Sequence, residues 1–113
     1  MSEKLIDPQA AVDYMIAKSG EFAQAKANRI YCEEYRKTLK SQLMKEAMIK
    51  FDSVNAQERE AYAHPDYKQH LLALREAVEQ EEKLRWMLIA AEARIEVWRS
   101  QEASKRSEHR MTV

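Results

Sequence analysis

The scarcity of helix-breaking residues constrains this chain more than any other feature. Its 113 residues contain one glycine, Gly20, and two prolines, Pro8 and Pro65. The rest is dominated by Ala, Leu, Met, Glu, Gln, Lys and Arg, which are the strongest helix formers. A proline fits the first turn of a helix but breaks its interior. The sequence therefore predicts an all-α fold in which the two long stretches opened by Pro8 and Pro65 form an antiparallel hairpin.

The first long helix is predicted over residues 8–51. Asp7 can accept hydrogen bonds from the free amides of the first turn, and Pro8 suits the first helical position. Asp52, Ser53 and Asn55 then form a polar cluster that should end the helix. Gly20 costs about 1 kcal/mol relative to Ala inside a helix, so it either allows close packing of a neighbour or marks a local bend.

A short helix and a second long helix follow. Asn55, with Glu58 three residues later, resembles a capping box and predicts a short helix over about 56–63. The residue before a proline disfavours helical geometry, so the second long helix should begin after Pro65 and span about 66–103. The last ten residues, 104–113, lose all periodicity and are predicted to be a frayed tail. Together these segments make a single helical domain, 1–113.

Apolar residues at steps of three and four predict which helix faces meet. The second long helix carries a coiled-coil-like seam, and the first carries a stripe that drifts around the helix. The seam comprises Leu74, Ala77, Glu81, Leu84, Leu88, Ala91, Ile95 and Trp98. The stripe comprises Val12, Ile16, Ser19, Ala23, Lys26 and Ile30, then Cys32, Tyr35, Leu39, Leu43, Ala47 and Phe51.

The predicted turn also sets a register between the two arms. It places Leu43 near Leu74, and it brings Arg36 and Lys37 opposite Glu81, where unlike charges could set the alignment. Two helices alone leave much of a wide apolar stripe exposed to water. This exposure favours a homodimer or higher oligomer that completes a helical bundle. The leftover apolar candidates are Tyr14, Met15, Tyr31, Met44, Met48, Trp86 and Met87.

Composition excludes several classes of protein. Nineteen basic and nineteen acidic residues cancel, so the chain is not a generally basic nucleic-acid binder. No apolar run approaches the roughly 18 residues of a membrane span, and the first residues lack the apolar core of a secretion signal. The single cysteine, Cys32, suits a reducing compartment and is interpreted as a small buried side chain. We therefore expect a cytoplasmic protein with no membrane partner.

No motif predicts catalysis or a cofactor. A hairpin without long loops offers little room for a pocket, and glycine-rich phosphate loops are absent. Glu60 with His64, and Asp66 with His70, share helix faces, but the Glu-x-x-His pattern of di-iron bundles is missing. The sequence predicts no enzyme activity, no catalytic or metal-binding residues, no cofactor and no small-molecule substrate.

Two groups of basic residues could contact nucleic acid or a protein partner. The group nearer the C-terminus contains an aromatic residue that could stack on a base, although Trp98 could instead pack in the seam. This group comprises Arg94, Trp98, Arg99, Lys105 and Arg106. A secondary basic patch comprises Arg36, Lys37, Lys40 and Lys45, unless the glutamates of the second arm neutralise it.

The segment 65–106 resembles small helical proteins encoded by tailed phages and prophages. The likeness lies in a Pro-acid-Tyr start, a Glu-Glu-Lys-Leu-Arg-Trp middle and an Ala-Arg-Ile-Glu-x-Trp-Arg-Ser ending. It is carried by Tyr67, Glu82, Leu84, Trp86, Ala93, Ile95, Glu96, Trp98 and Arg99. The resemblance implies a setting among phage recombination and replication genes and supplies no catalytic residues.

These observations predict a non-enzymatic, oligomeric helical accessory protein of phage DNA recombination or replication. It would act by binding a host or phage protein, DNA, or both, in the cytoplasm of the host cell. The alternative is a pure protein-interaction module, such as an inhibitor or adaptor of a host or phage enzyme, that does not bind DNA.

Overall fold

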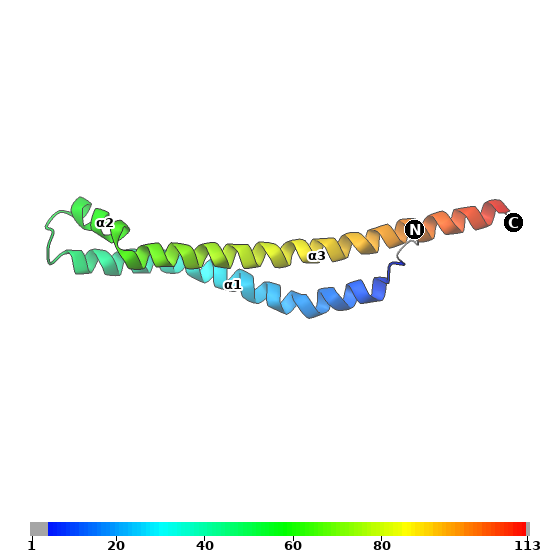
Figure 1. The fold of residues 1–113 in the computed structure, drawn as a ribbon, viewed down its shortest axis with the longest axis horizontal. Helices are drawn as coiled ribbons and strands as arrows, with labels where there is room; N and C mark the ends of the chain where they lie inside the picture. The colour runs from blue at the N-terminus through cyan, green and yellow to red at the C-terminus, as the bar shows by residue number, and fades with distance from the viewer. Residues whose placement is uncertain (1–4, 113) are drawn as a thin grey trace. The chain divides into compact units, whose positions relative to one another are not determined.

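The computed structural model describes residues 5–112, and these residues form three helices and no strand (Figure 1). Helix α1 spans Pro8–Ala47, α2 spans Val54–Ala63 and α3 spans Pro65–Thr112. The long helices α1 and α3 pack against each other with the short helix α2 between them in the chain. The prediction of an all-α hairpin with a short helix at the turn is confirmed. No helix in this part of the chain has the length and apolar character needed to cross a membrane.

The start of α1 follows from Asp7. Its Oδ1 accepts hydrogen bonds from the backbone amides of Gln9 at 3.0 Å and Ala10 at 3.2 Å. These amides would otherwise lack an acceptor in the first turn. Gly20 lies within α1, and a Cβ built there meets no atom within 4 Å. Close packing of a neighbour is therefore not the reason for this glycine.

The turn differs from its predicted boundaries at both ends. Helix α1 ends at Ala47 rather than at residue 51, because the amides of Lys50 and Phe51 both turn back to the Ala47 carbonyl. The cap of α2 is Ser53, whose hydroxyl accepts a hydrogen bond from the Ala56 amide at 3.1 Å. The predicted capping box at Asn55 is therefore wrong. Both residues can cap a helix, and α2 begins one residue after Ser53.

Helix α3 begins where the proline rule predicts. The residue before Pro65, His64, is extended with φ −66° and ψ 137°, as steric conflict with a following proline requires. The His64 Nδ1 accepts a hydrogen bond from the Asp66 amide at 3.0 Å and so helps to cap the new helix.

The C-terminal end of α3 lies at Thr112, past the predicted end at residue 103. The predicted frayed tail is therefore helical over 104–112, and Val113 lies outside the described residues. Although this segment lacks an apolar period, it contains no glycine or proline, and Lys105 pairs with Glu102 one turn earlier at 3.4 Å. Loss of amphipathic pattern removes a packing face but does not by itself stop a helix.

The chain divides into two compact units, each built from parts of both long helices. Unit 2 comprises Ala23–Glu82 and holds the cluster of buried side chains. Leu39 and Leu43 of α1 pack there with Ala61 of α2, and Tyr35, Met44 and Tyr67 pack around them. Helix α2 thus folds back over the C-terminal end of α1. Gln57 of α2 fixes this arrangement by donating a hydrogen bond from Nε2 to the Phe51 carbonyl at 2.8 Å.

This reversal shifts the register between α1 and α3 in unit 2. Because α2 covers the end of α1, α3 starts beside the last third of α1. Tyr67 packs against Leu39 and Leu43, and His70 Nε2 lies 2.6 Å from the Cys32 carbonyl. Glu81 pairs with Arg29 through both carboxylate oxygens, at 2.5 and 3.0 Å. The predicted placement of Arg36 and Lys37 opposite Glu81 is therefore wrong.

The Arg29 guanidinium also contacts Glu33 at 3.0 Å. Its hydrogen bonds to Glu81, followed by those to Glu33, raise the pKa of Arg29 above its usual value, against the opposing effect of burial.

The predicted seam of α3 is confirmed by burial, because all eight of its positions are buried or half-buried. The first half of the predicted stripe on α1 is wrong: Val12, Ile16 and Ile30 are exposed. Ala11 and Ala25 are buried instead. Arg29 lies on the same face of α1 as these two alanines, and from there its guanidinium reaches Glu81.

Candidate functional site

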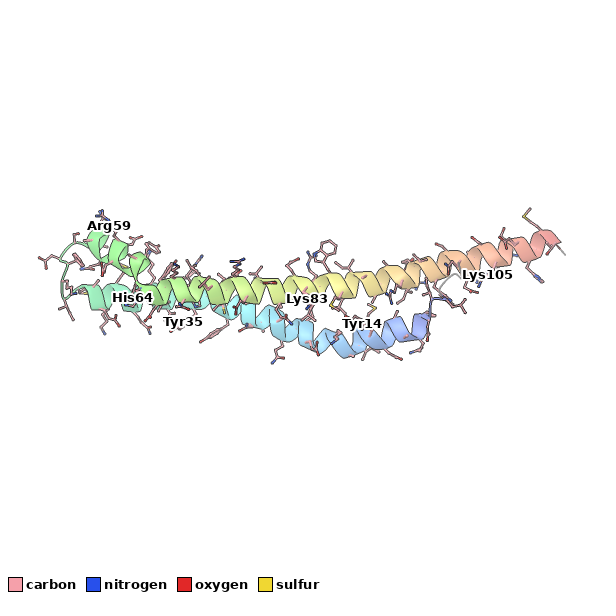
Figure 2. The ribbon with its side chains drawn as sticks, in the orientation of Figure 1. Tyr14, Tyr35, Arg59, His64, Lys83 and Lys105 are labelled. Carbon is pink, nitrogen blue, oxygen red and sulfur yellow. The ribbon has the colours of Figure 1, made fainter. Side chains whose placement is uncertain are left out.

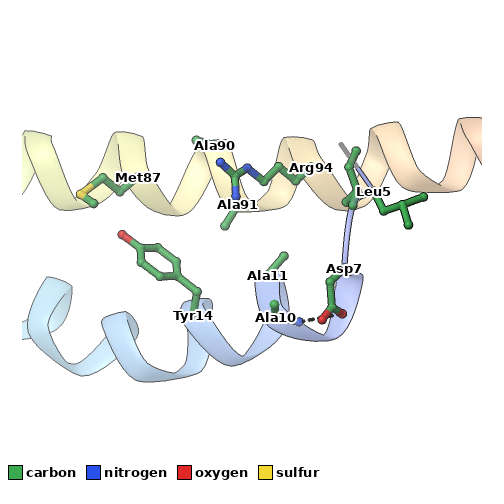
Figure 3. Close-up of a pocket in the computed structure, with 10 residues that line it drawn as sticks. Leu5, Asp7, Ala10, Ala11, Tyr14, Met87, Ala90, Ala91 and Arg94 are labelled. Atoms are coloured by element: carbon green, nitrogen blue, oxygen red, sulfur yellow. Dashed lines mark hydrogen bonds between the residues drawn. The ribbon is translucent and has the colours of Figure 1, made fainter. Parts of the chain in front are cut away.

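Unit 1 comprises, of the described residues, 5–22 and 83–112, and it contains a groove of about 820 Å³ between the start of α1 and α3 (Figure 3). Alanines face each other across it, with Ala11 on α1 directed toward Ala91 on α3. Because these side chains are small, they leave the space between the helices unfilled. The full lining is Leu5, Ile6, Asp7, Ala10, Ala11, Tyr14, Met87, Ala90, Ala91 and Arg94.

Three of these residues bring polar groups to the groove. The Tyr14 ring reaches from α1 toward Met87 on α3, and its buried hydroxyl has no hydrogen-bond partner among residues 5–112 (Figures 2 and 3). Arg94 is exposed and forms no ion pair within the same range. The Asp7 carboxylate is already engaged in capping α1. The groove thus offers an apolar floor, one hydroxyl and one cation.

The side of α3 that faces away from α1 is also apolar. We call it the outer face and define it as Trp86, Ile89, Ala90, Ala93 and Val97. Four of its positions lie two residues beyond the seam positions Leu84, Leu88, Ala91 and Ile95. Two residues are about 200° of rotation around a helix, so these positions lie opposite the seam. The outer face is therefore an apolar surface distinct from the seam.

The large side chains of the outer face are accessible. Trp86 is 58% exposed, Val97 is 48% exposed and Ile89 is 37% exposed. The Arg85 guanidinium stacks on the Trp86 ring, 4.9 Å from its centroid. Ala90 belongs both to the outer face and to the lining of the groove, so the two surfaces adjoin. Single exposed apolar side chains are ordinary, whereas a contiguous group of them indicates an interaction site.

The predicted C-terminal contact residues do not form one surface. Trp98 is half-buried at its seam position, as the alternative interpretation expected. Arg99 pairs with Glu96 at 3.0 Å, and Lys105, on the C-terminal part of α3 (Figure 2), pairs with Glu102. Arg94 lines the groove, and Arg106 is exposed without an ion pair within residues 5–112.

The secondary basic patch is partly neutralised, but not by the second arm. Lys37 pairs with Glu34 on its own helix at 3.2 Å, and Lys40 pairs with Glu58 of α2 at 3.2 Å. Arg36 and Lys45 are exposed and make no ion pair within the described range. Interactions with the Tyr62 side chain and then with Glu58 raise the pKa of Lys40. Lys40 therefore binds α2 and is not available to contact a nucleic acid or a protein partner.

The sequence signals for the outer face were incomplete. Trp86 stood out as an apolar residue left over by the seam, but Ile89 and Val97 did not. The informative signal was a second heptad-like set of apolar positions, two residues out of phase with the first. For metal binding, the described residues contain no group of three or more His, Cys, Asp or Glu side chains suited to hold an ion.

Comparison of the chain with protein-family models, curated proteins and solved structures found no match.

Proposed function

We propose that this chain is a non-enzymatic interaction module that acts by docking a protein on the outer face of α3. The observation that carries this proposal is the exposed row of Trp86, Ala90, Ala93 and Val97 on the side of α3 opposite its seam. Burying apolar surface contributes about 25 cal/mol per Å². Large aromatic side chains flanked by small ones are typical anchors of protein interfaces.

Site-specific photo-cross-linking in the expressing cell tests the proposal. A benzophenone side chain is introduced at Trp86 or at Val97, and a matched control carries it at Glu92, an exposed position of the same helix outside the outer face. We expect adducts of discrete mass from positions 86 and 97 and none from position 92. Absence of a discrete adduct at both outer-face positions, or equal adducts from all three, would contradict the proposal.

Nucleic-acid binding is a second candidate function, favoured by the last part of α3. Residues 103–112 are all exposed and carry Lys105, Arg106 and Arg110 against the single acid Glu108. Arg106 and Arg110 make no ion pair within the described residues, so both could contact phosphates. Contacts to the phosphates of DNA weaken steeply as the salt concentration rises, because the counterions that binding releases then contribute less free energy.

Retention of DNA across salt concentrations tests this second function. We expect single- or double-stranded DNA to bind at low salt, and the combined change Arg106→Gln and Arg110→Gln to reduce the slope of log affinity against log salt by about 2. The paired cations changed together, Arg99→Gln and Lys105→Gln, provide the matched control and should have a smaller effect. No retention at low salt would show that the chain does not bind DNA.

A role in phage DNA recombination or replication stays a prediction that rests on the resemblance of residues 65–106.

A further inference from the structure

We infer that the protein docked on the outer face is a second copy of this chain, bound with its α3 antiparallel. This inference rests on the proposed function and names the partner for the same surface. It follows from two properties of the outer face: its internal symmetry and the charges beside it.

Four of the five residues of the outer face pair about its centre, and the fifth, Ile89, comes opposite Arg94 of the other copy. Trp86 and Val97 lie at equal distances from the midpoint between residues 91 and 92, and so do Ala90 and Ala93. A twofold axis at that midpoint places Trp86 of each copy opposite Val97 of the other. It also places the two alanines opposite each other, where small side chains let the helices approach closely. An isologous contact of this kind closes on itself and forms a dimer.

The charges beside the outer face suit the antiparallel arrangement. Arg85 and Glu96 lie on the same flank, and the twofold axis brings Arg85 of one copy within about 3 Å, along the helix axis, of Glu96 in the other. Glu96 also pairs with Arg99 of its own chain at 3.0 Å, so Arg85 of the second copy would join an existing ion pair. On the other flank, Arg94 comes within about one turn of Trp86 in the second copy, where a cation can contact the indole. A parallel twofold pair would instead bring opposite flanks of the two helices together and keep Arg85 about 16 Å, along the helix axis, from Glu96 of the other copy, so this contact would be lost.

Sedimentation equilibrium of the purified full chain tests the inference. We expect a dimer for the wild type and at least a tenfold weaker dimer for Trp86→Glu, because a carboxylate would be buried against Val97. Ile16→Glu is the matched control, since Ile16 belongs to unit 1 and is 69% exposed, but lies on α1. It should dimerise as the wild type does, and circular dichroism checks that all variants keep their helix content.

Charge reversal tests the pairing itself. Arg85→Glu or Glu96→Arg alone should weaken the dimer several-fold, and the double variant should recover most of the loss. Orientation is read from a spin label at Gln101, with Cys32→Ala removing the native thiol. An antiparallel pair places the two labelled positions about 28 Å apart, and a parallel pair about 10 Å apart.

Three results would overturn the inference: a monomer at every concentration, a dimer unaffected by Trp86→Glu, or labels at the parallel distance. These results are separable from failure of the proposed function. If position 86 gives an adduct whose mass differs from twice that of the chain, the outer face binds a different protein. In that case the proposed function stands and the inference fails.

Discussion

Glu81 is an acidic side chain buried on the seam of α3, and its pairing with Arg29 joins the two long helices of unit 2. Glu81 is 8% exposed, and both of its carboxylate oxygens accept hydrogen bonds from the Arg29 guanidinium. A buried pair of this kind contributes less to net stability than its geometry suggests, because both ions lose hydration. Its main effect is to make other registers costly, since each would bury one charge without the other.

A double-mutant comparison tests this role for Glu81. Glu81→Ala alone should lower the urea midpoint of unfolding clearly, because Arg29 keeps only its half-exposed partner Glu33. Adding Arg29→Leu should recover part of the loss, since an apolar pair replaces the stranded cation. Urea titration followed by circular dichroism measures both midpoints. Equal losses in the single and double variants would show that the pair does not set the register.

Gly20 gives a prediction of opposite sign. A Cβ at this helical position meets no atom within 4 Å, and its φ is not positive. Gly20→Ala should therefore raise the free energy of unfolding by about 0.5–1 kcal/mol, because alanine loses less backbone entropy in a helix. Thermal or urea unfolding measures the change. A loss of stability would mean that position 20 contacts something in the functional state that the isolated chain does not contain.

Helix α2 packs over the C-terminal end of α1 and stabilises it there. Leu43 is 4% exposed and packs with Leu39 and Ala61 in the buried cluster of unit 2. Leu43→Ala should reduce the free energy of unfolding by about 2–4 kcal/mol, through lost burial and a residual cavity. Leu72→Ala is the matched control, because Leu72 is 43% exposed, and it should cost less than about 1 kcal/mol. Similar losses for both would contradict the packing described for α2.

The last part of α3 should behave differently from the rest of that helix. Residues 103–112 are exposed on every side, so the segment is held by local hydrogen bonds alone. An isolated helix of this length is marginal in water. Hydrogen exchange read by mass spectrometry should show rapid exchange over 103–112 and slow exchange over the buried seam around Leu84 and Ala91. Slow exchange over the terminal segment would mean that another chain covers it.

Some of these elements could be predicted from the sequence and others could not. The seam of α3 repeats at strict steps of three and four, so its buried face could be predicted. Helix α1 carries two competing apolar faces, and the sequence favoured Ile16 and Ile30 because they are larger than Ala11 and Ala25. Only the partner helix decides between such faces. The register also depended on α2 folding back over α1, which is a tertiary contact without a local signal.

The second apolar face of α3 has its physical reason in the packing of the chain as a whole. The seam of α3 packs against α1. The outer face, four of whose five residues lie two positions after those of the seam, packs against no other element within residues 5–112. The candidate site was only partly predictable for this reason. The sequence identified Trp86 as an apolar residue outside the seam. The outer face as a whole could be recognised only once the structure showed which side of α3 is covered by α1.

The proposed dimer couples folding to association, and this gives a last prediction. If the outer face is buried only between two chains, the dimer is more stable than its separated chains, and dilution shifts the equilibrium toward unfolding. The unfolding temperature of the wild type should therefore rise with protein concentration. That of Trp86→Glu should be lower and should rise less with concentration, because its dimer is weaker. Ile16→Glu should keep the concentration dependence of the wild type, because its substitution lies on α1.

Calorimetry over a hundredfold range of protein concentration measures these unfolding temperatures. A wild-type unfolding temperature that stays constant over that range would mean that each chain folds alone, and that the outer face of α3 serves a partner other than a second copy.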